Sequence, residues 1–248
     1  MPVSERQSLA AIHRTIERYY TARVSKFGPT PLGVDWTCTA AQELRFVQLL
    51  KICRFRSPFS LNDIGCGYGA LLAFLSKRYP NAKIDYLGID LSAAMISRAR
   101  RRYARHNRVK FKVGNTPPRI ADYCVASGIF NVKLTHDVRS WERFIAHTLR
   151  VLTSRSRYGL AVNFMLPAKE RRSTDDMLYR TSPSRWLEFC RSEFDCSSEV
   201  IADYGLREFT LLLKPRVSVD ENGLDRALKS MGSKSKAPVV RNRSSARR

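Results

Sequence analysis

The chain has 248 residues, of which 44% are apolar, so it can bury the core of one larger α/β domain and is not globally disordered. Its formal net charge of +22, from 44 Lys and Arg against 22 Asp and Glu, favours an anionic partner such as nucleic acid. No apolar run approaches the length of a membrane span, and the N-terminus lacks a secretory pattern. We therefore expect a cytoplasmic protein with no membrane partner.

The cysteine and histidine spacing bears on metal binding. The chain contains six cysteines and four histidines, and no two cysteines form a C-x-x-C pair. Zinc sites need closely spaced ligand pairs of this kind. We therefore expect no metal site, and we interpret the cysteines as reduced thiols in apolar segments.

The predicted elements begin with an N-terminal helical extension over residues 1–58. Apolar residues at Leu9, Ile12 and Ile16 recur at helical spacing and predict an amphipathic helix. Two Pro and two Gly within residues 26–36 predict an irregular loop after it.

A second helix is predicted after this loop. Thr39 and Gln42 have the spacing of a capping box, which predicts the helix start. Leu44, Val47 and Leu50 form one apolar stripe, which predicts the buried face.

Strand and helix signals alternate through residues 59–215, the predicted core. Strands are predicted at 59–64, 83–90, 109–115, 123–130, 158–164, 198–204 and 207–213, with helices between the earlier ones and one from Ser182-Pro183 to Phe194. Gly205-Leu206 is predicted to join the last two strands as a hairpin. The pattern predicts an α/β fold, a doubly wound seven-stranded mostly parallel sheet with a C-terminal antiparallel hairpin. Residues 216–248 are polar and basic and are expected to form a disordered tail.

A glycine-rich turn follows the first predicted strand. The sequence Asp63-Ile-Gly65-Cys-Gly67-Tyr-Gly69 places glycines where backbone can approach a ligand, at the start of a helix. Asp90 ends the next strand, where a carboxylate can bind ribose hydroxyls. A nicotinamide cofactor is the main alternative, but a carboxylate at Asp63 would repel its pyrophosphate. A cationic cofactor without phosphate, S-adenosylmethionine, suits Asp63.

Three consecutive motifs carry a resemblance to a known family. The run from Asp63 to Gly69, then Gly88-Ile-Asp90-Leu-Ser, then Gly114-Asn115, resembles the class I S-adenosylmethionine-dependent methyltransferases over residues 59–214. The resemblance implies a Rossmann-like methyltransferase fold, transferase activity and S-adenosylmethionine as cofactor. It implies that the methionine end lies at Asp63, Gly65, Gly67 and Gly69, the ribose at Asp90, and the adenine at Leu91 and Asn115. Asn115 stands where the family usually has Asp, and its carbonyl oxygen can accept the same hydrogen bond.

Further candidates lie after the fourth strand. Ser127 is expected at the cofactor, and Asn131 at the substrate unless it only caps a turn. His136 and Asp137 are the candidate general base. The alternative interpretation is that Asp137 caps the following helix and His136 is solvated.

The N-terminal extension supplies the remaining candidates. Tyr19, Tyr20 and Trp36 precede the core, where additions in this family commonly cover the cofactor, so they are expected to form a lid or substrate contact. The alternative is ordinary packing of an extra helix. Trp186 and Phe189 are interpreted as core residues.

These observations lead to one functional prediction and one alternative. The prediction is methyl transfer to an N, O or S atom of a small-molecule substrate, which could be anionic. The alternative is an RNA or protein methyltransferase that uses the basic surface; a run of arginines in residues 98–108 is itself interpreted as a solvated helix face. A non-catalytic binding module is disfavoured by the intact glycines and Asp90.

Overall fold

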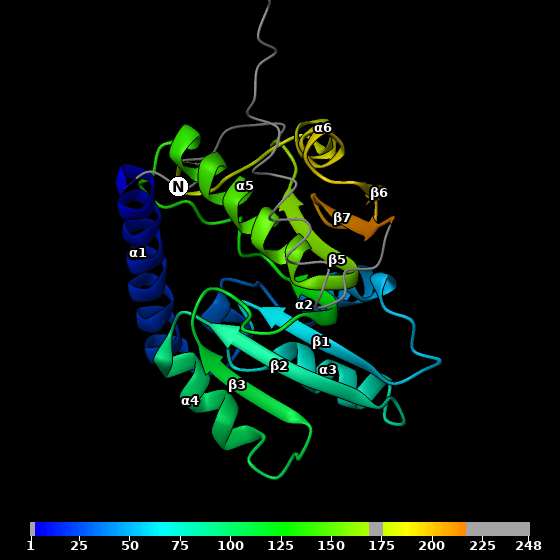
Figure 1. Cartoon of the computed structure of the whole chain (residues 1–248). Coiled ribbons are helices and arrows are strands. Elements are labelled where there is room, and N and C mark those ends of the chain that lie inside the picture. Colours follow the sequence, from blue (N-terminus) through cyan, green and yellow to red (C-terminus); the bar gives the residue numbers. More distant parts are fainter. Residues whose placement is uncertain (1–2, 169–175, 217–248) are drawn as a thin grey trace, which may run out of the picture.

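The computed structural model describes residues 3–168 and 176–216. Seven strands form one sheet in the order β3-β2-β1-β4-β5-β7-β6 (Figure 1). The strands are β1 (Phe59–Ile64), β2 (Ile84–Asp90), β3 (Val109–Val113), β4 (Ala121–Ala126), β5 (Ser156–Met165), β6 (Cys196–Ile201) and β7 (Glu208–Pro215). The helices are α1 (Val3–Phe27), α2 (Thr39–Leu49), α3 (Ala70–Arg78), α4 (Ala93–Arg102), α5 (Val138–Ser154) and α6 (Pro183–Glu193), with short 3₁₀ helices η1 (Pro31–Val34) and η2 (Leu50–Ile52).

Strand pairing determines where a ligand can bind. β1 pairs in parallel with β2 on one side and β4 on the other, and only β7 runs antiparallel to its neighbours β5 and β6. The strand order reverses between β1 and β4, and the carboxyl ends of these parallel strands meet at one edge of the sheet. Such a switch point is where open α/β sheets bind ligands. The predicted fold, including the antiparallel C-terminal strands, is confirmed.

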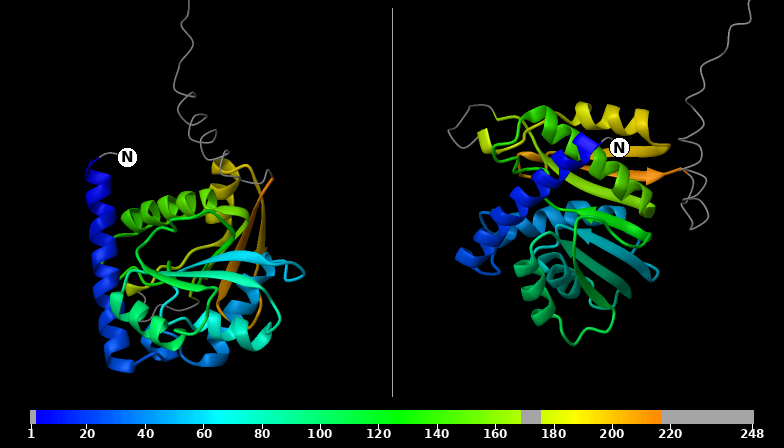
Figure 2. Two further views of the ribbon diagram at one scale, coloured as in Figure 1. Left: turned by 60° about the horizontal axis from the view of Figure 1, so that its bottom comes forward. Right: turned by 60° about the vertical axis from the view of Figure 1, so that its left-hand side comes forward.

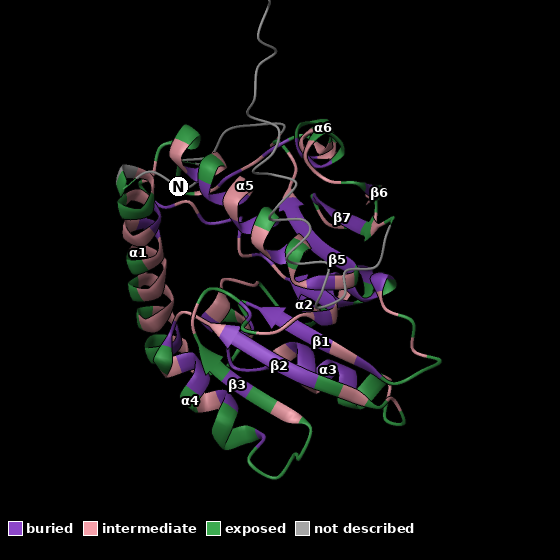
Figure 3. Ribbon diagram, in the orientation of Figure 1, coloured by how far each residue is buried: buried purple, intermediate pink, exposed green. Residues whose placement is uncertain are grey.

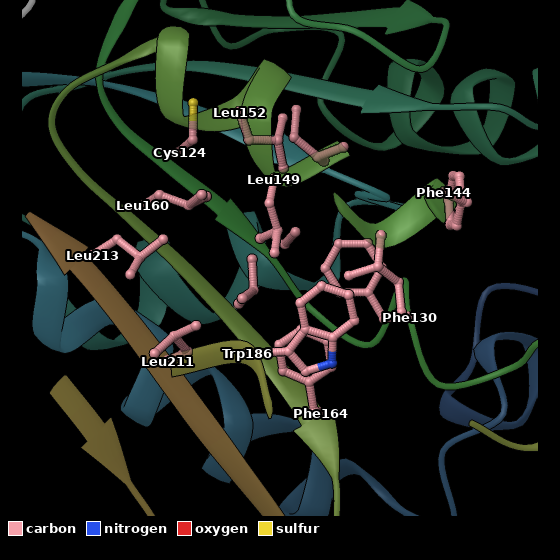
Figure 4. Close-up of a cluster of buried hydrophobic side chains, with 14 of the residues drawn as sticks. Cys124, Phe130, Phe144, Leu149, Leu152, Leu160, Phe164, Trp186, Leu211 and Leu213 are labelled. Carbon is pink, nitrogen blue, oxygen red and sulfur yellow. The ribbon is translucent and has the colours of Figure 1, made fainter. Parts of the chain in front are cut away.

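Two apolar layers hold the sheet, and both faces of its central strands are buried (Figure 3). One layer is contributed by α1, α5 and α6, whose side chains pack with Phe164 of β5 and Leu211 of β7 (Figure 4). Trp186 is 1% exposed within this layer, which confirms its prediction as a core residue. The other layer is contributed by α2, α3 and α4.

Helix α1 is not part of the alternating pattern. It runs along one side of the molecule and contacts α4 and α5, which lie at opposite ends of that side (Figure 2). Leu9 and Ile12 anchor its first half in the core, and Val24 is buried near its end. The helix therefore spans the carboxyl edge of the sheet. None of the helices in residues 3–168 and 176–216 is long and apolar enough to cross a membrane.

Several local predictions need correction. The predicted loop over residues 26–36 contains the 3₁₀ helix η1, because Pro31 suits the first turn of a helix. Helix α2 is capped by Cys38, whose sulfur accepts a hydrogen bond from Ala41 N, and not by Thr39. Its buried face carries Gln42 and Arg45, whereas Val47 of the predicted stripe is 40% exposed.

Element ends also differ from the sequence prediction. The strand predicted to reach residue 130 ends at Ala126, so residues 127–130 belong to the loop at the sheet edge. The connection between β6 and β7 spans residues 202–207 and is longer than a two-residue hairpin. The predicted tail lies outside the described residues from 217 onward.

Candidate active site

A pocket lies at the carboxyl ends of β1, β2 and β4, between the sheet edge and α1. Its walls include the glycine turn after β1, Asp90 and Leu91 after β2, Gly114 and Asn115 after β3, and Ser127 after β4. These are the four chain segments that the sequence motifs singled out. The fold thus brings together, in one cavity, residues more than 60 positions apart in the chain.

The backbone conformation of the turn after β1 requires glycine. Gly65 has a φ of +71°, and a Cβ there would lie 2.3 Å from Ile129 Cγ2. Gly67 has a φ of +54°, and its N–H donates to Asp90 Oδ2 at 2.9 Å. Left-handed backbone of this kind favours glycine. The turn therefore packs against Ile129 of the loop after β4, and its glycines line the pocket.

Two carboxyl groups stand beside this turn. Asp63 is 2% exposed, and its Oδ2 accepts the Tyr86 hydroxyl at 2.5 Å. Burial raises the pKa of Asp63 to about 7, with a smaller contribution from the charge of Asp90. Burial likewise raises the pKa of Asp90 to about 6, although Asp90 also accepts the N–H groups of Gly67 and Ser92. Both carboxyl groups would gain from a cation placed between them and the turn.

Asn115 is held by the N-terminal helix. Its Nδ2 donates to His13 Nδ1 at 3.0 Å, and its Oδ1 accepts the Thr116 hydroxyl at 3.0 Å. Burial, followed by the charge of His147, lowers the pKa of His13, which favours the neutral ring that can accept this bond. His13 lines the pocket and was not identified from the sequence, because a lone histidine on an amphipathic helix carries no motif.

Helix α1 forms the roof of the pocket. His13, Ile16, Glu17 and Tyr20 lie at helical spacing along the face that lines it. Thr21 extends this face to the sheet edge, since its hydroxyl lies 3.1 Å from Glu17 Oε1 and 2.7 Å from Ser92 Oγ. Tyr20, one of the residues predicted to form a lid or substrate contact, is therefore part of the pocket lining.

Tyr19 is not among the residues that line the pocket. Its phenol is hydrogen-bonded to Asp35, and burial, together with the Asp35 charge, raises its pKa to about 12. Asp35 also forms an ion pair with Arg23 at 2.6 Å. This group of contacts fixes the turn that carries Trp36.

Trp36 forms a wall of the pocket next to the β4 loop. Gly128, with a φ of +74°, lets the indole approach so closely that a Cβ would lie 2.4 Å from Trp36 Cζ2. The guanidinium carbon of Arg45 lies 3.7 Å from the centre of the Trp36 ring. Arg45 in turn forms two hydrogen bonds to Glu208, at 2.6 and 2.8 Å, inside the protein.

Asn163 closes this network. Its Nδ2 donates to Glu208 Oε2 at 2.8 Å, and its Oδ1 accepts the Gly128 N–H at 2.7 Å. A connected set of buried polar contacts therefore runs from β7 through α2 to the pocket wall. No sequence motif indicates it, because Arg45 and Glu208 are 163 residues apart.

Two polar residues after β4 have unused hydrogen-bonding capacity. Ser127 lines the pocket, and its buried Oγ has no hydrogen-bond partner among the described residues. Asn131 is 3% exposed, and neither atom of its side-chain amide has a partner within the described part of the chain. Asn131 does not line the pocket.

His136 and Asp137 lie outside the pocket lining. Asp137 is the N-cap of α5, and its Oδ1 accepts the Ser140 N–H at 2.9 Å. That bond lowers the pKa of Asp137. The His136 ring stacks on Trp141 with centroids 6.2 Å apart. The geometry therefore matches the alternative interpretation of Asp137 as a helix cap, and gives no support to this pair as a base.

The pocket differs in charge from the rest of the molecule. Asp63, Asp90 and Glu17 line it, and no Lys or Arg does so in residues 3–168 and 176–216. Paired carboxyl groups, a close-approach glycine turn and the unpartnered Ser127 hydroxyl fit a cationic nucleoside such as S-adenosylmethionine. Within the described residues there is no cluster of His, Cys, Asp and Glu that could hold a metal ion.

Comparisons with known proteins agree with this geometry. A methyltransferase domain model matches residues 62–155. The chain is 38% identical over 165 residues to the putative methyltransferase Rv1506c of Mycobacterium tuberculosis. This alignment covers 66% of the present chain and 98% of the relative. It is also 35% identical over 105 residues to a trans-aconitate 2-methyltransferase of Rhodopseudomonas palustris, spanning 39% of this chain and 40% of that protein.

Solved structures share the fold. A phosphoethanolamine N-methyltransferase of Haemonchus contortus aligns with a TM-score of 0.60 at 15% identity, over 90% of this chain and 54% of its own. Magnesium protoporphyrin IX methyltransferase of Synechocystis, with bound SAH, aligns with a TM-score of 0.51 at 12% identity, over 71% of this chain and 84% of its own. Motifs, topology and relatives agree: the chain belongs to the class I methyltransferases that use S-adenosylmethionine.

Proposed function

We propose that this enzyme transfers the methyl group of S-adenosylmethionine to an N, O or S atom of a small molecule. The observation that carries this proposal is the pocket itself, in which the buried Asp63 and the half-buried Asp90 flank a glycine turn beneath a covering helix. A pocket that a helix partly covers suits a small acceptor, because such a molecule can be surrounded on several sides. The six cysteines are free thiols, which supports a reducing, cytoplasmic location.

We propose the following roles at the cofactor. Asp63 faces the ammonium group, and Asp90 binds the ribose hydroxyls with acceptor capacity that its two backbone bonds leave unused. Leu91 and Asn115 contact the adenine, and Ser127 donates from the β4 loop. When bound, the cofactor supplies a methyl group on a positively charged sulfur.

The chain contributes positioning and exclusion of water rather than an evident base. Helix α1 and Trp36 line the pocket, so they limit the access of solvent to a reaction inside it. Trp36 and Gly128 fix the wall next to Ser127, which is the side left for the acceptor. Holding an acceptor atom in line with a methyl donor supplies most of what such a displacement needs.

The charge of the pocket bears on the acceptor class. Glu17, Asp63 and Asp90 repel an anion, so we propose a neutral or cationic acceptor. This departs from the anionic acceptor suggested by the net charge. It also departs from trans-aconitate, which appears in the names of several relatives.

One observation favours the alternative, an RNA or protein acceptor. Residues 91–121 contain nine Lys and Arg and no Asp or Glu. Of these nine, Arg119 is ion-paired with Asp85, and the other eight have no acidic partner among the described residues. A surface of this kind attracts phosphate or carboxylate groups.

A labelled-methyl screen decides between these acceptor classes. The purified protein is incubated with labelled S-adenosylmethionine and separate pools of metabolites, RNA and protein, with Asp90→Ala as the control. The proposal expects label in the metabolite pool that the control does not transfer. Label confined to RNA or protein would support the alternative.

A further inference from the structure

The connection from β3 to β4 differs from the other parallel crossovers of the sheet. β1 to β2, β2 to β3 and β4 to β5 are connected through α3, α4 and α5, whereas residues 114–120 connect β3 to β4 without a helix. A parallel crossover usually takes a dozen or more residues and forms a helix. Residues 114–120 instead cross the face of the sheet, where Arg119 donates to Asn62 of β1 at 3.1 Å and to Asp85 of β2 at 2.6 Å. This connection therefore supplies no helix to cover β2 and β3.

Two lysines of β3 lie on this face of the sheet. Lys110 pairs with Leu87 and Lys112 with Ile89 in the parallel ladder, so each lysine is on the same face as its partner. Leu87 and Ile89 belong to the layer of α1, α5 and α6, whereas α4 packs on the opposite face against Phe111. Both lysines are exposed, as is most of β3 (Figure 3), and neither forms an ion pair among the described residues. Because β3 is the outer strand of the sheet, both cations are accessible to a partner.

A groove follows β3 and has a basic lining. Its basic residues come from α4, the loop after it, β3 and the crossing segment: Arg100, His106, Lys110, Lys112 and Arg119. No Asp or Glu lines the groove within residues 3–168 and 176–216. The Arg100 guanidinium donates to the Phe111 carbonyl at 2.8 Å, which holds this cation at the strand edge. The groove shares no lining residue with the pocket at the carboxyl edge of the sheet, so it is a separate basic site.

The lining favours a nucleic-acid backbone over an acidic protein. Protein interfaces are anchored by aromatic and apolar side chains at their centre. Tyr103 and Phe111 line the groove, but each is only 8% exposed, so they offer no such anchor. A phosphate backbone instead needs only positive charges along its path. Arg105 and Arg108, exposed in the loop between α4 and β3, continue this path beyond the groove.

We infer that the groove along β3 is a docking site for the sugar-phosphate backbone of a nucleic-acid strand. Lys110 and Lys112 contact phosphates of this strand, since both are exposed cations on the groove wall. The described lining has no exposed aromatic side chain on which a base could stack, so binding does not depend on the base sequence. The inference goes beyond the proposed methyl transfer and does not rest on it, because the groove and the pocket are separate.

A salt titration of binding measures the phosphate contacts. The full-length protein is titrated into a fluorescein-labelled oligouridylate of about 20 nucleotides, and anisotropy gives the affinity from about 0.1 M to about 1 M salt. A double variant, Lys110→Gln with Lys112→Gln, removes two of the cations. Each phosphate contact to a single strand contributes about 0.7 to the slope of log affinity against log salt. We therefore expect the slope to fall by about 1.4, which corresponds to roughly 25-fold weaker binding at about 0.1 M salt if the affinities converge at about 1 M.

A matched double variant, Arg139→Gln with Arg191→Gln, is the control. It removes the same charge from exposed positions of α5 and α6, and α6 packs on β6 at the opposite edge of the sheet from β3. Exposed charges more than about 10 Å from a ligand are largely screened at about 0.1 M salt, so the control should bind within about threefold of the unaltered protein. Calorimetry with S-adenosylhomocysteine checks that both variants are folded, since none of the four residues lines the pocket.

Several outcomes would overturn the inference. They are equal weakening by the two double variants, unchanged binding by the lysine variant, and no binding of oligouridylate by the unaltered protein. Tighter binding of labelled poly-glutamate, or of phosphatidylglycerol vesicles, than of oligouridylate at the same salt would also overturn it, because the partner would then be an acidic protein or a membrane surface. A protein that binds oligouridylate as expected but not S-adenosylhomocysteine would support the docking site and contradict the proposed function, so the two can fail separately.

Discussion

Removing the buried Arg45 should destabilise the protein far more than removing an arginine from an exposed ion pair. Arg45 and Glu208 are 7% and 3% exposed and share two hydrogen bonds of 2.6 and 2.8 Å. Arg45→Met leaves the Glu208 carboxylate buried with Asn163 as its remaining donor among the described contacts. An uncompensated buried charge costs about 3–5 kcal/mol. For a domain of this size, each kcal/mol lowers Tm by about 2–4 °C, so a fall of roughly 6–20 °C is expected.

The matched control is Arg150→Met. Arg150 also makes two hydrogen bonds to a glutamate, Glu193, at 2.7 and 3.0 Å, but the side chains are 44% and 27% exposed. Solvent screens this pair, so its loss should cost no more than about 1 kcal/mol. Thermal melts and urea titrations of both variants measure the difference.

A double variant tests whether the cost comes from the stranded charge. Adding Glu208→Gln to Arg45→Met removes the carboxylate and should recover part of the lost stability, because a neutral amide is cheaper to bury. The fluorescence of Trp36 should also change in the single variant Arg45→Met and in the double variant, since the guanidinium carbon of Arg45 lies 3.7 Å from the centre of the Trp36 ring. A double variant less stable than Arg45→Met, or a single variant no worse than Arg150→Met, would refute the reasoning.

The remaining predictions concern the cofactor and the tail. Cofactor affinity should rise with pH between about 5.5 and 8. Burial raises the pKa of Asp63 to about 7 and that of Asp90 to about 6, and the ionised carboxylates attract the cationic cofactor. An affinity that calorimetry finds constant over this pH range would contradict the prediction. In the ligand-free protein the pH dependence of stability runs in the opposite direction. Between the ordinary pKa of 3.8 and about 7, the folded state keeps carboxyl protons that the unfolded chain has lost. The contribution of these groups to the free energy of unfolding, measured in melts, therefore falls as pH rises towards 7. Asp90→Ala should weaken cofactor binding by about 1–3 kcal/mol through lost hydrogen bonds. Gly67→Asp should abolish cofactor binding, because Gly67 lines the pocket and an added side chain would occupy the space of the ligand. Normal titrations of either folded variant would mean that the site is misplaced. Removing residues 219–248, which carry 8 basic and 3 acidic residues, should leave folding and cofactor binding unchanged, and a truncated protein that binds no cofactor would disprove the predicted domain boundary.

The local sequence was sufficient to predict the sheet and the family to which the chain belongs. Strands buried on both faces read as continuous apolar runs, and their alternation with helical spacing admits few topologies. The glycine turn and Asp90 could be recognised because the residues concerned are neighbours in the chain. Such signals are short-range, and the pairing of β1 with β2 and β4 follows from them once the fold class is known.

The prediction for the buried face of α2 was wrong because the residues of this face depend on distant partners. Val47 fits an apolar stripe, but α2 instead buries Gln42 against Tyr68 and Arg45 against Glu208. Asp137 was predicted as a base or as a helix cap, and in the structure its Oδ1 accepts the Ser140 N–H of its own helix.

Helix α1 shows the same division between sequence and tertiary structure. Its periodicity predicted a helix, but only its docking between α4 and α5 places His13, Glu17 and Tyr20 over the pocket. The sequence by itself determined the element types and the cofactor motifs, since both depend on local backbone and pattern. The roof, the Trp36 wall and the burial of Gln42 were decided by tertiary structure, because a polar side chain is buried only where a partner from another element meets it.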